Sequence, residues 1–433
     1  MFAHYDFAKI RKKTVSLQTI IAIPMFKKIL NTLFMKFFTA ASGFAIIILV
    51  SHLLGTAGKG QQAVIAFNIN IIMLIFTLMG NSTLVYLAPR KKFSELLIPS
   101  LLWTFLCAGV ISLICQLGLL GTFAGTIDTQ KYFQQTIGIS VLASITEINY
   151  YFLLGKQKVI QANNLKLVYP LTNVVLIVGM WLLNRFNTIG QYVFSLWIAY
   201  ILSFFYGILI LKREYKQLYL LKKSEFIENT KTLFRLGAIR QVGGIAQTMV
   251  YRISLMLMIL FFGKKGEAFN GIYSNATSIS EAILLFGTSL ALVQYSSLSN
   301  TQSNKEAKEL TIKMTTVNVV VTAIGLSVVC SLPKNFWVFL FGQGFEHVGW
   351  YIRILAIGIL LLSSTSNITQ YFASRGNFSI TASASVCSLA ISFICGYILI
   401  PLYNITGAAI TAVAAYTTGF LIEFVYFLKW IKR

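Results

Sequence analysis

The most constraining feature of this chain is a series of apolar blocks, each about 20 residues long, that recur from near residue 29 to near residue 430. A helix of about that length crosses the roughly 30 Å of hydrocarbon in a bilayer. Only 11% of the residues are charged, whereas soluble domains carry about 25%. We therefore predict an all-α polytopic membrane protein.

Short polar or glycine-containing stretches divide the blocks into twelve predicted spans. The spans cover residues 29–54, 63–87, 97–120, 133–155, 165–183 and 192–211 in the first half, and 241–262, 269–297, 314–332, 350–372, 378–402 and 407–430 in the second. Residues 1–28 form a predicted basic cytoplasmic segment without the pattern of a cleaved signal peptide, and residues 212–240 a predicted basic cytoplasmic linker. The chain thus divides into an N-lobe (29–211, helices 1–6) and a C-lobe (241–433, helices 7–12).

Lysine and arginine follow the loops of this arrangement. The formal net charge of +23 would suggest a nucleic-acid partner in a soluble protein. With the N-terminus inside, however, the predicted cytoplasmic segments hold 26 of the 36 Lys and Arg residues and the outer loops hold 6. Positive charge concentrates on the cytoplasmic side of membrane proteins. We predict a multi-pass protein of the bacterial inner (plasma) membrane with both termini cytoplasmic, a linker lying on anionic headgroups, and no nucleic-acid partner.

The two halves carry matching features at a nearly constant offset in sequence. Leu54-Gly55, at the end of the first span, corresponds to Phe262-Gly263 at the end of the seventh. Tyr151-Phe152, in the fourth span, recurs as Tyr371-Phe372 in the tenth. Because each repeat has six helices, the halves share one orientation and are related by an axis along the membrane normal. Transporters with such parallel repeats hold their substrate between the repeats.

Charged residues within the spans are candidates for function, because each costs roughly 2.5–3.5 kcal/mol at a helix centre. Lys36 lies about a third of the way into the first span, level with Asn81, and the second span holds no acid to pair with it. Lys36 either binds an anion or extends to the inner headgroups. Arg252 and Glu281 lie at nearly equal distances from the turn between spans 7 and 8. They are predicted to meet near the midplane, as a structural ion pair or an ion-coupling pair.

Three further ionisable residues are ambiguous from sequence. Arg240, at the cytoplasmic mouth of span 7, is either a substrate-binding residue or an ordinary interfacial anchor. Glu147 and Glu423 lie in the cytoplasmic halves of spans 4 and 12 and could bind a proton or sodium ion, although Glu423 is close enough to Lys429 to be structural. The five cysteines lie in apolar blocks and the three histidines are scattered, which predicts no disulfide and no metal site. No cofactor is expected, and coupling to H⁺ or Na⁺ is optional.

The chain lacks the signatures of an enzyme. It has no glycine-rich phosphate loop followed by Lys-Ser/Thr and no paired carboxylates on a predicted outer loop. The longest such loop, residues 333–349, contains only Lys334, Glu346 and His347 as ionisable residues. We predict no catalytic residues and no enzymatic activity.

Four segments resemble, in order and spacing, the multidrug/oligosaccharidyl-lipid/polysaccharide (MOP) superfamily, and within it the polysaccharide and O-antigen flippases. These segments are Leu54–Gly60 before span 2, Phe269–Ala276 opening span 8, Leu340–Phe345 before span 10 and Gly407–Ala412 opening span 12. The resemblance implies two six-helix lobes in a V shape, as in multidrug and toxic compound extrusion (MATE) transporters. It also implies alternating access through a cationic central cavity in which Lys36, Arg240 and Arg252 engage a diphosphate.

These observations predict a flippase that moves a polyisoprenyl-diphosphate-linked oligosaccharide from the cytoplasmic to the outer leaflet, for assembly of polysaccharide, capsule, O-antigen or exopolysaccharide. Lys36, Arg240, Arg252 and Asn81 are the predicted substrate-binding residues. The expected partners are the lipid-linked glycan, membrane lipids, and polysaccharide polymerase or glycosyltransferase machinery. One alternative is a MATE-type multidrug/cation antiporter, although the acid that such exporters typically carry in the first span is absent. The other is a non-transporting scaffold of a glycan-synthesis complex.

Overall fold

The computed structural model describes residues 7–431 apart from 82, 120, 122–124 and 301–302, and these residues form helices and connecting turns without strands. The helices are α1 (Phe7–Phe76), α2 (Thr83–Leu87), α3 (Phe93–Gln116), α4 (Ile127–Gln130), α5 (Phe133–Gly155), α6 (Val159–Leu182), α7 (Ile189–Ile210), α8 (Lys212–Lys216), α9 (Lys223–Phe262), α10 (Lys264–Asn300), α11 (Asn304–Ser331), α12 (Lys334–Phe341), α13 (Val348–Ser374) and α14 (Phe378–Ile431). Nine helices in the described part of the chain are long and apolar enough to cross a membrane. The predicted all-α polytopic membrane fold is confirmed.

Two of these helices are long enough to cross twice, and both contain a bend. In α1 the bend is at Gly55 (φ 66°, ψ −167°), and in α14 it is at Asn404 (φ 53°, ψ −125°). Glycine, and less often asparagine, adopts a positive φ at low cost. The bends therefore separate predicted span 1 from span 2, and span 11 from span 12. Helix α10 falls outside the set of nine apolar helices, so the count of twelve spans stays a prediction.

The chain reversals repeat between the two halves. A residue with positive φ stands at the corresponding turn of each half in three cases. The pairs are Gly55 and Gly263, Gln157 and Gly376, and Asn184 and Asn404. The members of each pair are separated by nearly the offset of the sequence repeat. The common backbone geometry supports duplication of a six-helix unit.

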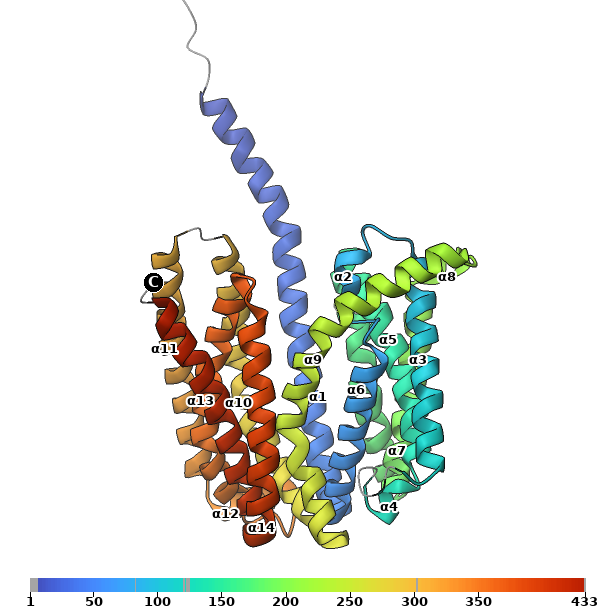
Figure 1. Ribbon diagram of the computed structural model, residues 1–433, viewed down its shortest axis with the longest axis vertical. Coiled ribbons are helices and arrows are strands. Elements are labelled where there is room, and N and C mark those ends of the chain that lie inside the picture. Colours follow the sequence, from blue (N-terminus) through green and yellow to red (C-terminus); the bar gives the residue numbers. More distant parts are fainter. Residues whose placement is uncertain (1–6, 82, 120, 122–124, 301–302, 432–433) are drawn as a thin grey trace, which may run out of the picture.

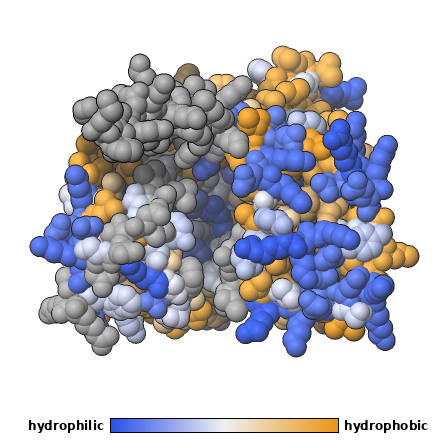
Figure 2. Space-filling view, turned by 90° about the horizontal axis from the view of Figure 1, so that it is seen from above, coloured by the Kyte–Doolittle hydropathy of each residue, from blue (hydrophilic) through white to orange (hydrophobic). Residues whose placement is uncertain are grey.

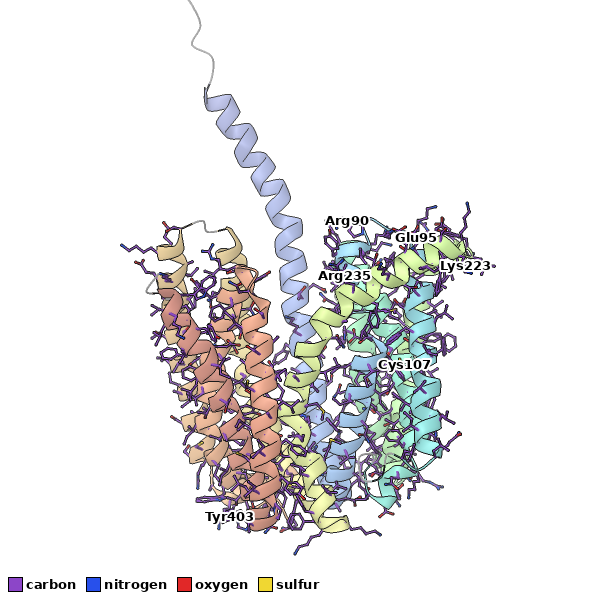
Figure 3. All side chains as sticks on the ribbon, in the orientation of Figure 1. Arg90, Glu95, Cys107, Lys223, Arg235 and Tyr403 are labelled. Carbon is purple, nitrogen blue, oxygen red and sulfur yellow. The ribbon has the colours of Figure 1, made fainter. Side chains whose placement is uncertain are left out.

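Figure 1 shows the helices gathered into two groups. Helices α3, α5, α6 and α7 lie on one side, α10, α11, α13 and α14 lie on the other, and α1 and α9 run between them. The start of α1 and the end of α14 lie at the same end of the bundle, which requires an even number of crossings. We call this the basic end, because Arg90, Lys223 and Arg235 lie there, whereas Tyr403 lies at the opposite end (Figure 3).

Most of the predicted linker is helical. Helix α8 covers Lys212–Lys216, and α9 begins at Lys223, several turns before the predicted start of span 7 at residue 241. The first part of α9 crosses the basic end above α3 before it turns into the bundle (Figure 1). Leu220 and Ile227 are exposed in this region, close to several lysines. This mixture of exposed apolar and basic residues fits the predicted position of the linker on lipid headgroups. The boundaries of the two lobes remain predictions.

Candidate functional site

The molecule is hollowed at its basic end. Figure 2 looks onto this end and shows a depression between the two halves. Hydrophilic residues cover the half that contains α2, α8 and the first part of α9. The depression lies between the two halves, which also contact each other elsewhere in the bundle.

The halves approach each other closely where α1, after its bend, crosses α10. A Cβ atom on Gly60 would lie 1.7 Å from the carbonyl oxygen of Glu267, and one on Gly271 would lie 2.0 Å from the carbonyl oxygen of Thr56. Contact this close between two backbones leaves room only for glycine. We call this contact the glycine crossing. It follows the bend at Gly55 directly and therefore lies toward the end of the bundle opposite the basic end.

Buried polar side chains surround the glycine crossing. Lys59 is buried, and its Nζ donates to Oε1 of Gln62 (2.7 Å) and to Oγ of Ser274 (3.1 Å). Glu267 is also buried and accepts hydrogen bonds from Nε2 of Gln61 (2.8 Å) and from the hydroxyl of Thr126. Each of these two networks joins α10 to the first half of the chain. Together they tie the halves to each other beside the crossing.

Arg252 and Glu281 form a bidentate ion pair within the second half. Nη1 and Nη2 of Arg252, on α9, lie 3.1 and 3.0 Å from Oε1 and Oε2 of Glu281, on α10. Both side chains are 28% exposed. Two parallel charge-assisted hydrogen bonds fix the relative orientation of the groups as well as their distance. The structure thus brings together Arg252 and Glu281, which were predicted to meet because they lie at nearly equal distances from the turn between predicted spans 7 and 8.

A polar cavity of about 180 Å³ lies between the first half and α9, and we call it the N-lobe cavity. It is lined by Met73, Leu74, Thr77, Asn81, Glu147, Tyr151 and Gln241. Nδ2 of Asn81 donates to Oε1 of Gln241 (3.1 Å), which joins the turn between α1 and α2 to α9. Glu147 forms an ion pair with Lys166 of α6 through Oε1. Its other oxygen, Oε2, is buried and has no hydrogen-bond partner among the residues described.

A second, smaller cavity of about 30 Å³ lies within the C-lobe beside Glu423. Glu423 is only 2% exposed and accepts a hydrogen bond from Oγ1 of Thr369 (2.8 Å). No lysine or arginine in the described part of the chain forms an ion pair with it. Lys429, the partner considered from sequence, instead lies over the ring of Tyr426, with Nζ 5.6 Å from the ring centroid. Glu423 is therefore a buried carboxyl group in a small polar cavity.

This arrangement matches that of several solved structures. No protein-family model and no curated protein sequence matches the chain. An inward-facing MATE-family transporter of the MOP superfamily superposes with a TM-score of 0.73 at 12% identity, over 91% of this chain and 94% of that chain. The lipid II flippase MurJ, in an inward closed conformation, gives a TM-score of 0.71 at 18% identity, over 92% of this chain and 89% of that chain. The chain shares the fold of these structures.

A third solved structure, in another conformation, also matches the fold. An outward-facing MATE-family transporter gives a TM-score of 0.65 at 11% identity, over 93% of this chain and 94% of that chain. The predicted resemblance is confirmed for the MOP fold. The polysaccharide and O-antigen branch is not distinguished, because a MATE transporter and a lipid flippase match almost equally well.

The other predicted substrate-binding residues occupy different places on the MOP fold. Lys36 is exposed on α1 beside the exposed Phe34 and Phe37, and no described residue pairs with its ammonium group. Asn81 lines the N-lobe cavity, where it contacts Gln241. The side chain of Arg240 lies outside the described residues. Lys36, Asn81 and Arg252 are thus not gathered into one cluster of contacting side chains.

Two features of the site were not predicted. Lys59 lies between predicted spans 1 and 2 and is therefore one of the six cations expected in outer loops, whereas it is buried at the glycine crossing. The Glu147–Lys166 pair was also missed, although the two residues lie at nearly equal distances in sequence from the turn at Gln157. Equal distance from a turn is the same signal that indicated the Arg252–Glu281 pair.

Proposed function

We propose that the protein is a flippase that carries a polyisoprenyl-diphosphate-linked oligosaccharide from the cytoplasmic to the outer leaflet of the inner membrane. The observation that carries the proposal is Lys36, which is exposed on α1 and pairs with none of the described residues; α1 contains no acidic residue. A lysine ammonium group without a counter-ion is available to a diphosphate, which it binds as a point charge and without the bidentate geometry of arginine. Glycosyltransferase or polymerase machinery on either side of the membrane would supply and consume the lipid-linked glycan.

Alternating access would follow if the two ends of the molecule opened in turn. The hollow at the basic end admits the head group while the glycine crossing closes the other end. Opening the crossing and closing the basic end would then release the head group on the other side, with the lipid tail remaining in the bilayer. A negative-inside potential favours outward movement of an anion by roughly 2.3 kcal/mol per charge per 100 mV. A coupling ion is therefore optional.

A second candidate function is a MATE-type cation antiporter, favoured by Glu423. A buried carboxyl group in a polar cavity is a suitable site for a proton or a sodium ion. The comparisons do not prefer the flippase over this alternative, since both kinds of transporter share the fold. The absence of an acid from α1 favours the flippase, because a cationic drug would meet an uncompensated ammonium group there.

We expect Lys36→Gln to lower the flipping rate about tenfold or more in proteoliposomes loaded with lipid-linked oligosaccharide extracted from the native membrane. A charge-assisted hydrogen bond contributes about 1.5–3 kcal/mol, and its loss weakens diphosphate binding accordingly. Oxidation of exposed sugar diols by membrane-impermeant periodate measures the fraction that has been flipped. Lys36→Arg should retain activity.

Lys334→Gln, at an exposed lysine of α12, provides the matched control and should flip at the wild-type rate. A wild-type rate for Lys36→Gln would show that the cationic-cavity mechanism is wrong. Efflux of a quaternary ammonium dye from the same vesicles, without flipping, would identify a MATE-type antiporter. Purified protein that moves neither substrate would support the scaffold alternative.

A further inference from the structure

The side chains that line the N-lobe cavity differ from those expected of a site for a diphosphate or for a cationic drug. Its lining combines one carboxylate, two amides, a tyrosine and a short apolar surface. We propose that this cavity binds one sugar residue of the transported glycan through its hydroxyl groups. The inference rests on the proposed function and adds to it a second recognition site, separate from Lys36.

The charge of the cavity selects a neutral ligand. Glu147 supplies a negative charge, and the ammonium group of Lys166 neutralises it through the ion pair with Oε1. A diphosphate placed here would meet the carboxylate of Glu147, and like charges at contact distance repel. A cationic drug would have to compete with Lys166 for the same carboxylate. An uncharged, polyhydroxylated group avoids both penalties.

The hydrogen-bonding groups that remain free fit hydroxyl ligands. Oε2 of Glu147 is buried and lacks a partner among the described residues, so it is an acceptor that a hydroxyl group would satisfy. Nε2 of Gln241 uses one hydrogen to donate to the carbonyl oxygen of Leu74 (2.5 Å) and has a second hydrogen available. A sugar hydroxyl both donates and accepts hydrogen bonds, so two adjacent hydroxyls could satisfy Glu147 and Gln241 together.

The size of the cavity limits its occupant. Pockets for drug-sized ligands have volumes of about 300–1,000 Å³, whereas this one has about 180 Å³. One sugar ring fits this space better than a chain of sugars, and the side chains of Met73 and Leu74 offer apolar contact to its C–H face.

The position of the cavity connects its occupant with both halves of the chain. Met73 and Leu74 belong to α1 and Glu147 to α5, whereas Gln241 lies on α9, the helix that begins the second half. A sugar bound to Glu147 and Gln241 would therefore bridge the halves. The same head group could contact Lys36 through its diphosphate, so recognition of the two parts would be divided between two sites.

Binding to the purified full-length protein in detergent tests this inference, with titration calorimetry as the readout. One probe is the free oligosaccharide released by mild acid from the native lipid-linked pool, and the other is inorganic pyrophosphate. We expect Glu147→Gln to weaken oligosaccharide binding at least tenfold without weakening pyrophosphate binding. Lys36→Gln should have the opposite pattern. Glu309→Gln, at an exposed acid of α11, is the matched control and should bind both probes like the wild type.

A double variant keeps the test valid if Glu147→Gln is unstable. Glu147→Gln with Lys166→Met removes both charges of the ion pair and leaves no unpaired ammonium group, and it should also lose oligosaccharide binding. Wild-type oligosaccharide affinity in either folded variant, or no binding of the oligosaccharide by the wild type, would overturn the inference. Oligosaccharide binding that depends on Glu147, in a protein that neither binds pyrophosphate nor flips lipid, would overturn the proposed function and leave the sugar site in place.

Discussion

The variant Gly271→Ala should lose the glycine crossing. The added Cβ would lie 2.0 Å from the carbonyl oxygen of Thr56 and 3.2 Å from the backbone nitrogen of Gly60, so α1 and α10 must move apart. Overpacking of this kind costs about 1–3 kcal/mol. Because that cost falls only on the conformation in which the crossing is closed, we expect the equilibrium to shift toward an open crossing by about five- to 150-fold.

Thiol labelling measures this shift. Ser274→Cys introduces a thiol in place of a buried hydroxyl beside the crossing. In a background without the five native cysteines, this thiol should react with a soluble maleimide much faster when Gly271→Ala is present. Gly109→Ala, on α3, is the matched control, because a Cβ there meets nothing within 4 Å. Equal labelling rates for the two alanine variants would mean that the crossing tolerates a side chain and does not close the molecule.

Glu281→Gln should destabilise the protein by about 3 kcal/mol. The guanidinium group of Arg252 would lose two charge-assisted hydrogen bonds of 3.0 and 3.1 Å and would remain charged in a largely desolvated position. Removal of one partner from a buried ion pair costs about 3–5 kcal/mol, and the partial exposure of this pair places it at the lower end. The apparent melting temperature of the purified protein measures the effect.

The double variant Arg252→Gln/Glu281→Gln separates the loss of a counter-ion from the loss of the pair. It should recover much of the stability, because no unpaired charge remains. Asp128→Asn breaks the pair between Asp128 and Lys264, whose side chains are 37% and 74% exposed, and should cost less than about 1 kcal/mol. If Glu281→Gln is no more damaging than Asp128→Asn, the Arg252–Glu281 pair is not structural, and a role in transport becomes the better account.

Hydropathy predicts the membrane helices of this chain well, because a helix that crosses hydrocarbon must be apolar along its whole span. Helix α5 begins and ends at the predicted residues, 133 and 155. Helix α9 begins at Lys223 instead of the predicted residue 241, since its first part lies at the basic end and alternates apolar with charged residues. Helix propensity extends a helix beyond the hydrocarbon, and a hydropathy threshold does not detect that extension.

The contacts of the site are of two kinds: those across a single turn could be predicted from the sequence, and those between the two halves could not. Arg252 and Glu281 meet across a single turn, so equal spacing from that turn is sufficient to pair them. Lys59 and Ser274 come from opposite halves of the sequence, and their contact depends on how two lobes cross. The crossing in turn depends on backbone approach at two glycines, which hydropathy does not measure. The N-lobe cavity depends on the path of α9 over the first half, so it could not be predicted from the sequence either.

The glycine crossing has the form of an isologous interface. Gly60 faces the backbone of Glu267, and Gly271 faces the backbone of Thr56. Thr56 and Glu267 have the same separation in sequence as Gly60 and Gly271, so each contact is the counterpart of the other. Reciprocal contacts of this kind are the mark of two identical subunits that meet on a twofold axis. The protein is therefore built like a symmetric dimer whose subunits have been joined into one chain.

Joining the subunits frees each half to acquire residues of its own. The corresponding positions Thr56 and Glu267 already differ in charge. The offset that relates Gly55 to Gly263 also relates Lys36 to Gly244, so the second half carries no ammonium group at that position. A true dimer would have to place the same side chain at both positions, whereas the joined chain can present an asymmetric surface to an asymmetric substrate.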